Sequence, residues 1–487
     1  MDLARFLQIS EEGYTHIPVV QTLLADLDTP LSVYLKLASG PFSYLLESAL
    51  QQERFGRYSF IGLPTDHYLK VRDFSVEVYQ HHQVVERFEG NPLGFIENYF
   101  KRFKVKTIEN LPDFQGGMVG YFSYEINQYY EKRLHPNLLP KAVDVPDIFL
   151  LLSQEIAVVD NFSGKIYLIV HARAGNKEDF ERAQERLSTL REKLRQPTSL
   201  SLSLGSKFAK VESEISDEQF KKYVEKIRRY IYEGECMQVV PSRRLVVDYS
   251  DSPLNLYRAL RTSNPSPFLL YYDFGDFHIA GASPELLLRK RKDIITVRPL
   301  AGTRRRGQTP EEDLSLEQDL LHDEKELAEH MMLIDLGRND VSKISEIGSV
   351  KLTEKMQIER YSHVMHIVSN VQGQSRAGTG LMDILASTFP AGTLSGAPKI
   401  RAMEIIQELE PSRRGIYGGA LGYLSFAGDI DLAIGIRTAI IKDKKAYLQT
   451  GAGIVADSNS ERELQETKNK VLSLLKAIRN VEEGLDN

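Results

Sequence analysis

The sequence predicts a folded, enzyme-sized chain of mixed helices and antiparallel strands. Its first part is rich in short runs in which apolar and polar residues alternate, with turn residues between them. Its second part mixes strands with helices but lacks the regular βαβ order of a doubly wound sheet. Hydrophobic residues make up 42% of the 487 residues and charged residues 26%, as in ordinary globular proteins.

The strand-like runs of the first part are residues 42–48, 58–62, 74–80, 148–159 and 165–172. Their period of two residues predicts an antiparallel sheet. Residues 176–195 show the charged amphipathic pattern of a helix. The Ser-rich segment that follows, residues 197–213, predicts a linker.

A second helix is predicted from Ser216, which forms a capping-box pattern with Gln219. Apolar residues then recur at helical spacing, and Gly234 marks the end of this helix. The remaining strand predictions are an antiparallel pair at residues 286–292 and 294–300 and a hairpin within residues 431–450.

Composition excludes several classes of protein. The net charge of −6 argues against general binding to nucleic acid or anionic membranes. The single cysteine, Cys236, excludes an intrachain disulfide and thiolate metal sites. The N-terminus does not resemble a signal peptide, and no apolar stretch is long enough to span a bilayer. We therefore expect a cytoplasmic enzyme.

Two glutamates are candidate ligands for a hard divalent cation. Glu329 lies within an apolar stripe of a predicted helix, where a carboxylate is costly to bury unless it is paired or binds a metal. Glu466 shares a helix face with Glu463 and Lys470, after a capping-box pattern of Ser460 with Glu463. Mg²⁺ prefers such oxygen ligands. The alternative for both glutamates is an exposed, solvated charge.

Glycine-rich connections gather in the second part of the chain, at residues 301–307, 389–398, 415–423 and 451–453. Glycine lets backbone N–H groups approach an anion closely. Arg437 is expected in a strand whose same-face neighbours are small, so that its guanidinium can reach a carboxylate. Together these features favour an anionic small-molecule substrate.

Two glycine-rich patterns are rejected as nucleotide sites. Residues 451–456 satisfy the dinucleotide pattern, but the next helix begins only near Ser460 and no βαβ unit can be completed. Residues 392–399 fail the P-loop spacing. On spacing alone, His366 is more typical of a satisfied core residue than of a catalyst.

Seven segments, in order, resemble the motifs of the chorismate-utilising enzymes: residues 281–288, 299–307, 323–341, 360–366, 392–406, 418–439 and 451–470. The resemblance implies an α+β fold, with large antiparallel β-sheets packed face to face as a sandwich and helices on the outside. It also implies four regions. They are an N-terminal region (1–196) with a candidate tryptophan effector site, the linker (197–213), a chorismate-binding catalytic region (214–482) that interleaves with the first, and a tail (483–487).

Two positions separate the chemistries within this family. By the resemblance, Gln238 stands at the position where isochorismate and salicylate synthases carry a general-base lysine that activates water. An amide cannot take up a proton to do this. Ala301 stands where many aminodeoxychorismate synthases carry a nucleophilic lysine. Residues 45–48 and 264–268 further resemble the effector-site motifs of the anthranilate synthase component I branch. The resemblance therefore implies ammonia as the nucleophile, anthranilate and pyruvate as products, and feedback inhibition by tryptophan.

The resemblance also implies roles for individual residues. Glu285 corresponds to the general acid, His366 to the histidine of the later elimination, and Glu329 and Glu466 to the Mg²⁺ ligands. The implied substrate contacts are Gly302, Thr303, Thr393, Tyr417, Arg437, Gly451, Ala452, Gly453 and Lys470, and the implied tryptophan contacts are Ser48, Pro267, Phe268 and Leu269. Two departures from the family pattern predict a bulge at Pro241 and surface variation at Arg305.

No glutamine-hydrolysing domain is recognisable, because Cys236 lacks the Gly-flanked elbow of an amidotransferase nucleophile. The resemblance therefore implies a separate glutamine amidotransferase subunit that supplies ammonia. One alternative is aminodeoxychorismate synthase component I, which uses the same substrates and aminates C4 of chorismate. An alternative from another class is a non-catalytic tryptophan- or chorismate-binding module.

Overall fold

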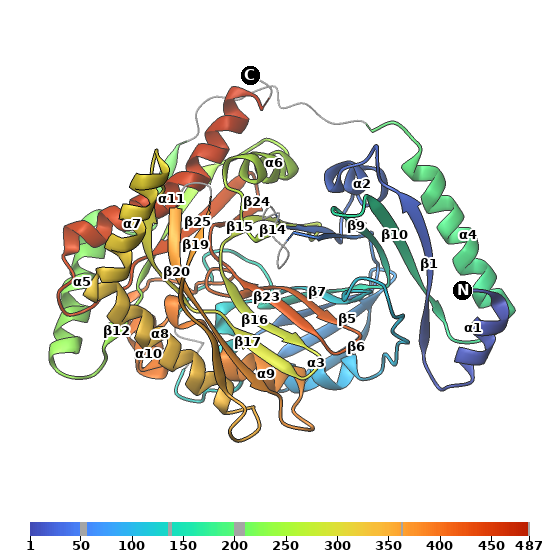
Figure 1. Ribbon diagram of the computed structural model, residues 1–487, viewed down its shortest axis with the longest axis horizontal. Helices are drawn as coiled ribbons and strands as arrows, with labels where there is room; N and C mark the ends of the chain where they lie inside the picture. The colour runs from blue at the N-terminus through green and yellow to red at the C-terminus, as the bar shows by residue number, and fades with distance from the viewer. Residues whose placement is uncertain (49–55, 135–138, 199–209, 362–363, 486–487) are drawn as a thin grey trace.

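Two large antiparallel sheets dominate the computed structural model of the chain, with helices on the outside (Figure 1). The structure describes residues 1–48, 56–134, 139–198, 210–361 and 364–485. The first sheet has eleven strands and the second has twelve. This architecture confirms the predicted α+β class.

The first sheet runs in the order β1 (His16–Leu24), β10 (Lys165–Arg173), β9 (Glu155–Asp160), β3 (Tyr58–Gly62), β2 (Ser43–Glu47), β14 (Phe268–Asp273), β15 (His278–Ser283), β24 (Thr438–Lys442), β25 (Lys445–Gly451), β13 (Ser242–Asp248) and β11 (Val211–Ser213).

The second sheet runs in the order β18 (Leu300–Arg305), β20 (Val364–Gln374), β17 (Ile294–Val297), β16 (Leu286–Arg291), β23 (Ile430–Ile434), β22 (Ala420–Ser425), β7 (Gly117–Phe122), β8 (Ile148–Ser153), β4 (Tyr68–Arg72), β5 (Ser75–Gln80) and β6 (Gln83–Glu89), and β19 (Lys351–Arg360) also pairs with β20. A small separate ladder joins β12 (Gln238–Val239) to β21 (Gly396–Ala397).

The α-helices are α1 (Leu3–Ser10), α2 (Pro30–Leu37), α3 (Pro92–Phe100), α4 (Lys177–Leu194), α5 (Asp217–Tyr232), α6 (Pro253–Ser263), α7 (Pro310–His322), α8 (Glu324–Ser342), α9 (Leu381–Thr388), α10 (Lys399–Leu409) and α11 (Ser460–Glu483). Two short 3₁₀ helices are η1 (Tyr124–Tyr129) and η3 (Gly392–Leu394).

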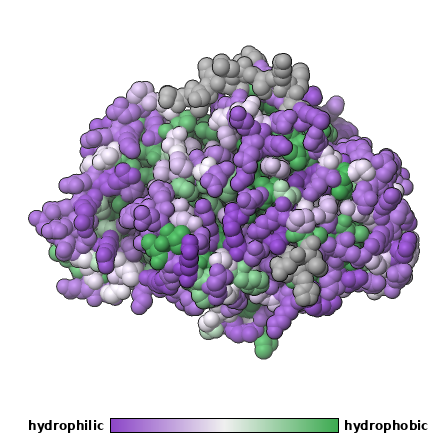
Figure 2. Space-filling model, turned by 180° about the vertical axis from the view of Figure 1, so that it is seen from behind, coloured by the Kyte–Doolittle hydropathy of each residue, from purple (hydrophilic) through white to green (hydrophobic). Residues whose placement is uncertain are grey.

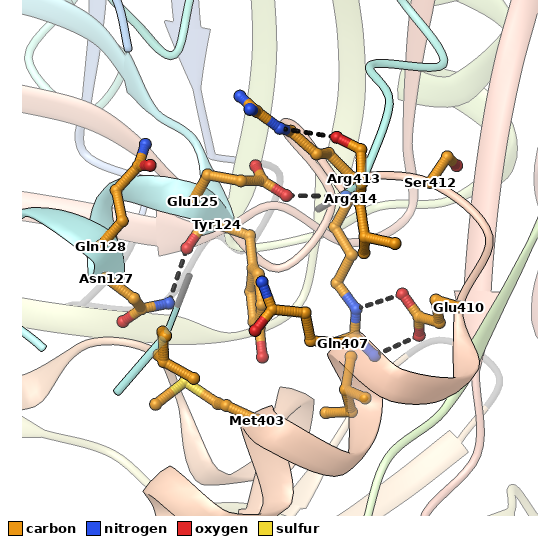
Figure 3. A pocket seen from close by; sticks show the side chains of 13 residues that line it. Tyr124, Glu125, Asn127, Gln128, Met403, Gln407, Glu410, Ser412, Arg413 and Arg414 are labelled. Atoms are coloured by element: carbon orange, nitrogen blue, oxygen red, sulfur yellow. Dashed lines mark hydrogen bonds and ion pairs between the residues drawn. The ribbon is translucent and has the colours of Figure 1, made fainter. Parts of the chain in front are cut away.

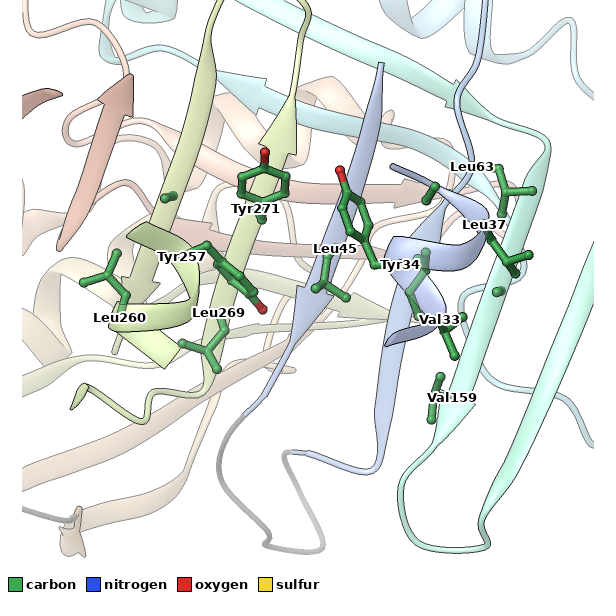
Figure 4. Close-up of a cluster of buried hydrophobic side chains, with 14 of the residues drawn as sticks. Val33, Tyr34, Leu37, Leu45, Leu63, Val159, Tyr257, Leu260, Leu269 and Tyr271 are labelled. Carbon is green, nitrogen blue, oxygen red and sulfur yellow. The ribbon is translucent and has the colours of Figure 1, made fainter. Parts of the chain in front are cut away.

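Alternation along the central strands gives each sheet two buried faces. In β14, Leu270 and Tyr272 join the cluster between the two sheets, which also contains Phe149 of β8. Leu269 and Tyr271 of the same strand belong to the outer cluster, where helices α2 and α6 cover them (Figure 4). The period of two residues thus places successive side chains in different cores.

Strands from both portions of the chain pair directly with one another. Glu47 of β2 lies opposite Leu269 of β14 in the first sheet. Gly120 of β7 lies opposite Gly422 of β22 in the second sheet. Each sheet is therefore built from strands that are far apart in the sequence.

The prediction of a single strand-like run at residues 148–159 is wrong. The apolar run at residues 148–159 is not one strand, because it divides at Gln154 into β8 of the second sheet and β9 of the first. Both strands are buried almost throughout, so hydrophobicity does not change where the chain crosses between the sheets. The other four runs of the first part each contain a strand.

Several local predictions are confirmed. Helix α4 lies within residues 176–195, and the Ser216 hydroxyl caps α5 by accepting from the N–H of Gln219. The expected pair is β16 with β17, and the hairpin within 431–450 is β24 with β25. The end of the predicted linker forms β11, whereas residues 199–209 lie outside the described part of the chain.

The surface is mainly hydrophilic on the face seen in Figure 2, where hydrophobic side chains occur as separate patches. Among the helices of the described residues, none has the length and hydropathy needed to cross a membrane.

We predict that Gly422→Ala destabilises the protein. Gly422 has a φ of +151°, and a Cβ atom there would lie 2.1 Å from the carbonyl oxygen of Asp431 in the neighbouring strand. The strands would have to separate, at a cost of about 1–3 kcal/mol. The melting temperature should fall. Gly94→Ala is the matched control, because Gly94 lies in α3 with no atom within 4 Å of the added methyl, and it should not lower the melting temperature.

Candidate active site

Glu285 lies where the chain passes from the first sheet to the second, between Ser283 at the end of β15 and Leu286 at the start of β16. The residue is only 7% exposed, and its Oε1 accepts a 2.9 Å hydrogen bond from the Thr393 hydroxyl. Burial raises the pKa of Glu285 to about 7, although the Thr393 hydrogen bond and the charge of Lys470 act in the opposite direction. Near neutral pH this carboxyl can therefore hold a proton and donate it as a general acid.

His366 lies on β20, opposite Thr303 of β18. Its Nδ1 atom is 3.0 Å from the carbonyl oxygen of Gly302 and 3.0 Å from the Thr303 hydroxyl. A carbonyl oxygen only accepts, so we assign the ring proton to Nδ1 and the lone pair to Nε2. Burial lowers the pKa of His366, so the ring is neutral near neutral pH and can accept a proton.

Gly302 forms a bulge in β18, where the pairing with β20 shifts register. Its φ is +67°, and a Cβ atom there would lie 3.0 Å from Leu320 of α7 and 3.2 Å from the carboxylate of Glu326 on α8. Glycine avoids both the backbone strain and this crowding. The bulge brings the carbonyl oxygen of Gly302 within hydrogen-bond distance of His366.

A second group of expected substrate residues gathers at the end of β25. The Lys470 ammonium donates to the carbonyl oxygen of Gly451 over 3.2 Å, and the Arg437 guanidinium donates to the carbonyl oxygen of Lys470. A Cβ atom on Gly451 would lie 2.9 Å from the Tyr417 hydroxyl, so glycine allows this close approach. The neighbouring Ala452 is fully buried. An ammonium, a guanidinium and a hydroxyl around one short segment suit a carboxylate ligand.

The structure corrects the prediction that Arg437 lies in a strand. Strand β23 ends at Ile434 in the second sheet, and β24 begins at Thr438 in the first. Arg437 lies in the bend between them, with a φ of +51°, because the ladder is interrupted where the chain changes sheets. Its guanidinium interacts electrostatically with Tyr417 and Glu466.

Gln238 and Glu329 are joined by a hydrogen bond beside Gly453. The Gln238 amide nitrogen donates to the Glu329 carboxylate over 3.0 Å. Gln238 is 2% exposed, whereas Glu329 is partly exposed. A Cβ atom on Gly453 would lie 2.6 Å from that amide nitrogen and 3.7 Å from the carboxylate. The loop after β25 therefore passes close to Glu329.

The two glutamates expected to bind Mg²⁺ approach this loop from different helices, α8 and α11. Glu329 lies near Gly453, and Glu466 forms a 2.6 Å ion pair with Lys470. Within the described residues, no group of three or more His, Cys, Asp and Glu side chains could hold a metal. Two carboxylates nevertheless fit Mg²⁺, which commonly binds one or two protein carboxylates and takes its remaining oxygens from water and substrate.

Two predictions about the chain near these residues are wrong. Helix α11 is capped by the side chain of Asn459, and Ser460 is its first residue, because an asparagine caps as well as a serine and lies one position earlier. Pro241 does not form a bulge within one strand. It separates β12 from β13, which belong to different ladders, because proline has no N–H to donate.

Glu463, Glu466 and Arg305 differ in how far they are exposed to solvent. Glu463 is 8% exposed, whereas 46% of the Glu466 side chain is exposed, so these two carboxylates have different environments. Arg305 is exposed, as surface variation requires, and forms an ion pair with Glu312.

The two segments expected to form an effector site lie on neighbouring strands. Glu47 of β2 pairs with Leu269 of β14, so Ser48 is next to Phe268 across the sheet. Pro267 is buried just before that strand. The Ser48 hydroxyl is buried and has no hydrogen-bond partner among the described residues, which end at this position and resume at residue 56. A buried hydroxyl of this kind can bind a polar ligand group at little desolvation cost.

Sequence analysis missed a buried ion pair next to the substrate residues, formed by Arg414 and Glu410 (Figure 3). The two residues are 2% and 4% exposed, and the Arg414 guanidinium carbon lies 5.6 Å from the centre of the Tyr417 ring. The available signal was the i, i+4 spacing of opposite charges, but that spacing is also common on exposed helix faces.

These features define a class of protein. The site combines a carboxyl that holds a proton, at a crossing between the sheets, with a neutral histidine on β20 and several cationic or hydroxyl groups. This is the arrangement of an enzyme that acts on a small anionic molecule.

Comparison with known proteins gives the family. Residues 53–476 match the family described as chorismate binding enzyme. The chain is 59% identical over 478 residues to anthranilate synthase component 1 of Neisseria meningitidis serogroup A, covering 98% of this chain and 97% of the relative. It is 50% identical over 492 residues to anthranilate synthase component 1 of Pseudomonas aeruginosa, covering 100% of both chains.

A solved structure agrees with these relatives. The crystal structure of anthranilate synthase component I from Streptococcus pneumoniae matches with a TM-score of 0.78 and 37% identity, covering 93% of this chain and 99% of that one. The chain therefore belongs to the chorismate binding enzyme family, as its motifs predict, and the two relatives from Neisseria meningitidis and Pseudomonas aeruginosa are named anthranilate synthase component 1.

We predict that Glu285→Gln stabilises the protein more at pH 8 than at pH 5. The pKa of Glu285 is raised from 4.5 to about 7 by burial, so the wild type loses stability as the pH rises through this range, by at most about 3 kcal/mol. Glutamine stays neutral throughout. The difference in melting temperature between variant and wild type should therefore grow with pH.

Glu109→Gln provides the control, because the Glu109 side chain is exposed. The difference in melting temperature between this variant and the wild type should not grow with pH. An equal effect of Glu285→Gln at both pH values would contradict a buried carboxyl that holds its proton.

Proposed function

We propose that the chain is the chorismate-converting subunit of a Mg²⁺-dependent anthranilate synthase. It would convert chorismate and ammonia into anthranilate and pyruvate, the first committed step of tryptophan biosynthesis. The relatives at 50–59% identity over nearly the whole chain support this proposal. The observation in the site that carries it is Gln238, whose buried amide stands beside Glu329 at the position where water-using relatives would need a basic group.

Glu285 would supply the proton for the first step. Ammonia adds at C2 of chorismate while the hydroxyl at C4 leaves, and hydroxide is a poor leaving group unless it is protonated to water. The buried carboxyl, with its pKa raised to about 7, suits this transfer. Thr393 fixes the orientation of the carboxyl through its hydroxyl.

His366 would act in the second stage, in which pyruvate is eliminated and the ring becomes aromatic. Its neutral ring has the lone pair on Nε2, because Nδ1 is bound to Gly302 and Thr303. Such a nitrogen can take up a proton released from the ring. Chorismate carries two carboxylates, and Arg437, Lys470 and the hydroxyl of Tyr417 provide suitable partners for an anion.

Mg²⁺ would be held by Glu329 and Glu466, and when bound it would neutralise a substrate carboxylate. Glu466 is exposed, and the Gln238 amide binds one oxygen of the Glu329 carboxylate, so carboxylate oxygens are available for such an ion. Lys470, which pairs with Glu466, would then move between this carboxylate and the substrate.

Ammonia would come from a separate glutamine amidotransferase subunit, as the designation component 1 of the relatives suggests. Tryptophan would bind at the end of the paired strands β2 and β14, at Ser48, Pro267, Phe268 and Leu269, and inhibit the enzyme through these strands. A coupling free energy of about 1–3 kcal/mol between the two sites is sufficient.

We expect the purified chain to form fluorescent anthranilate from chorismate, ammonium and Mg²⁺, and to lose this activity when the metal is chelated. Product identity would be established by chromatography against anthranilate. A 4-amino product would instead indicate aminodeoxychorismate synthase, and isochorismate without ammonium would indicate water as the nucleophile. Absence of turnover with intact chorismate binding would indicate a binding module.

Tryptophan binding can be followed directly, because the chain contains no tryptophan. We expect the emission of added tryptophan to change on binding and the activity to fall in parallel. In Ser48→Phe a bulky ring replaces the buried hydroxyl, so both responses should be lost. Inhibition that survives this substitution would place the effector site elsewhere.

A further inference from the structure

The Arg414 guanidinium is anchored inside the protein to the Glu410 carboxylate, which Figure 3 shows, and to two backbone carbonyl groups. It donates two hydrogen bonds to Glu410, of 2.9 and 2.6 Å, one of 2.6 Å to the carbonyl oxygen of Leu394, and one of 2.6 Å to that of Val240. Four of its five N–H donors are thus used. Because the residue is 2% exposed, these bonds are protected from water.

Two of these acceptors belong to different segments of the candidate site. Leu394 ends η3 and directly follows Thr393, whose hydroxyl binds Glu285. Val240 directly follows β12, the two-residue strand that carries Gln238. The guanidinium therefore fixes the segment that carries Thr393, the hydrogen-bond partner of Glu285, relative to the segment that carries Gln238.

Glu410, the carboxylate partner of Arg414, connects this ion pair to a third segment of the site. Glu410 also accepts hydrogen bonds from the backbone nitrogen and the hydroxyl of Ser242, of 2.7 and 2.8 Å. Ser242 pairs with Gly451 between β13 and β25. Two aromatic rings also contact the Arg414 guanidinium, whose carbon lies 4.7 Å from the ring centre of Tyr124 and 5.6 Å from that of Tyr417.

We propose that Arg414 is a positioning residue for catalysis, which sets the contact between Thr393 and Glu285 through its hydrogen bond to Leu394. This inference rests on the function proposed above. The planar fork of the guanidinium reaches Glu410 and two backbone carbonyls at once. A lysine ammonium is a point charge with three donors and does not reproduce that geometry. In Arg414→Lys, η3 would lose its anchor and the Thr393 hydroxyl would move away from the carboxyl.

The expected signature is a change in the pH dependence of the reaction. The hydrogen bond from Thr393 lowers the pKa of Glu285, so its loss raises that pKa. A general acid is active when protonated, and activity falls as the pH rises through its pKa. The alkaline limb of kcat should therefore move to higher pH.

The other charged or titratable groups near Glu285 should keep their positions in Arg414→Lys. The charged or titratable ones are Lys470 on α11, Tyr361 after β19, Arg298 after β17 and Asp340 on α8. The Arg414 guanidinium binds Glu410, Leu394 and Val240 rather than these side chains, so their effect on the carboxyl is common to the wild type and the variant.

The test uses the full chain with chorismate, Mg²⁺ and ammonium. We expect Arg414→Lys to lower kcat/KM for chorismate about 100-fold, as small misplacements of catalytic groups do, and to move the alkaline limb up by about one pH unit. Thr393→Val should move this limb in the same direction. Combining the two substitutions should move it no further than Thr393→Val alone, because both act on one contact.

Arg413→Lys is the matched control. Its guanidinium binds Asp73 and the carbonyl oxygen of Leu139, away from η3 and β12, so it should leave the limb in place. Glu410→Gln is a second, milder variant that weakens the same anchor, and it should shift the limb in the same direction by less.

The experiment distinguishes a failure of the Arg414 inference from a failure of the proposed function. If Arg414→Lys and Glu410→Gln lower the melting temperature but leave the alkaline limb unchanged, Arg414 serves stability alone and the inference is overturned. If the wild-type chain forms no anthranilate, the proposed function fails instead.

Discussion

The central strands of both sheets are buried on both faces, and this constraint decides where polar chemistry can be placed. Strands β8 and β22 are buried along their whole length. A polar side chain within such a strand would need a partner inside the core. Two of the candidate groups, Glu285 and Arg437, instead lie where the chain changes sheets, between β15 and β16 and between β23 and β24, because backbone pairing is interrupted there and leaves room for side chains.

Two buried glutamates show how their partners decide their chemistry. Glu410 meets the Arg414 guanidinium and two donors from Ser242, so both of its carboxylate oxygens accept hydrogen bonds. Glu285 has a hydroxyl from Thr393 as its hydrogen-bond donor, and burial outweighs it. The first carboxylate therefore serves as an anchor, and the second retains a proton that it can transfer. The chain places these roles on neighbouring segments of one site.

Local patterns predicted much of this fold. Periodicity located α4 and α5, a capping pattern located the start of α5, and the hairpin of β24 and β25 was found within its predicted residues. The break at Gln154 and the bend at Arg437 could not be predicted, because the crossings between sheets depend on packing between distant strands. The family motifs gave the candidate residues, but not the ion pair of Arg414 with Glu410, whose importance depends on burial and on the backbone carbonyls that it reaches.

The pairing of β2 with β14 has a consequence for biosynthesis of the protein. Residue 47 emerges from the ribosome long before its partner at residue 269, and residue 120 of β7 emerges long before residue 422 of β22. The nascent N-terminal portion therefore carries unpaired, apolar strand edges until more than half of the chain has been made. Such edges pair readily with other chains. The order of synthesis thus leaves these edges open to other nascent chains until β14 and β22 have been made.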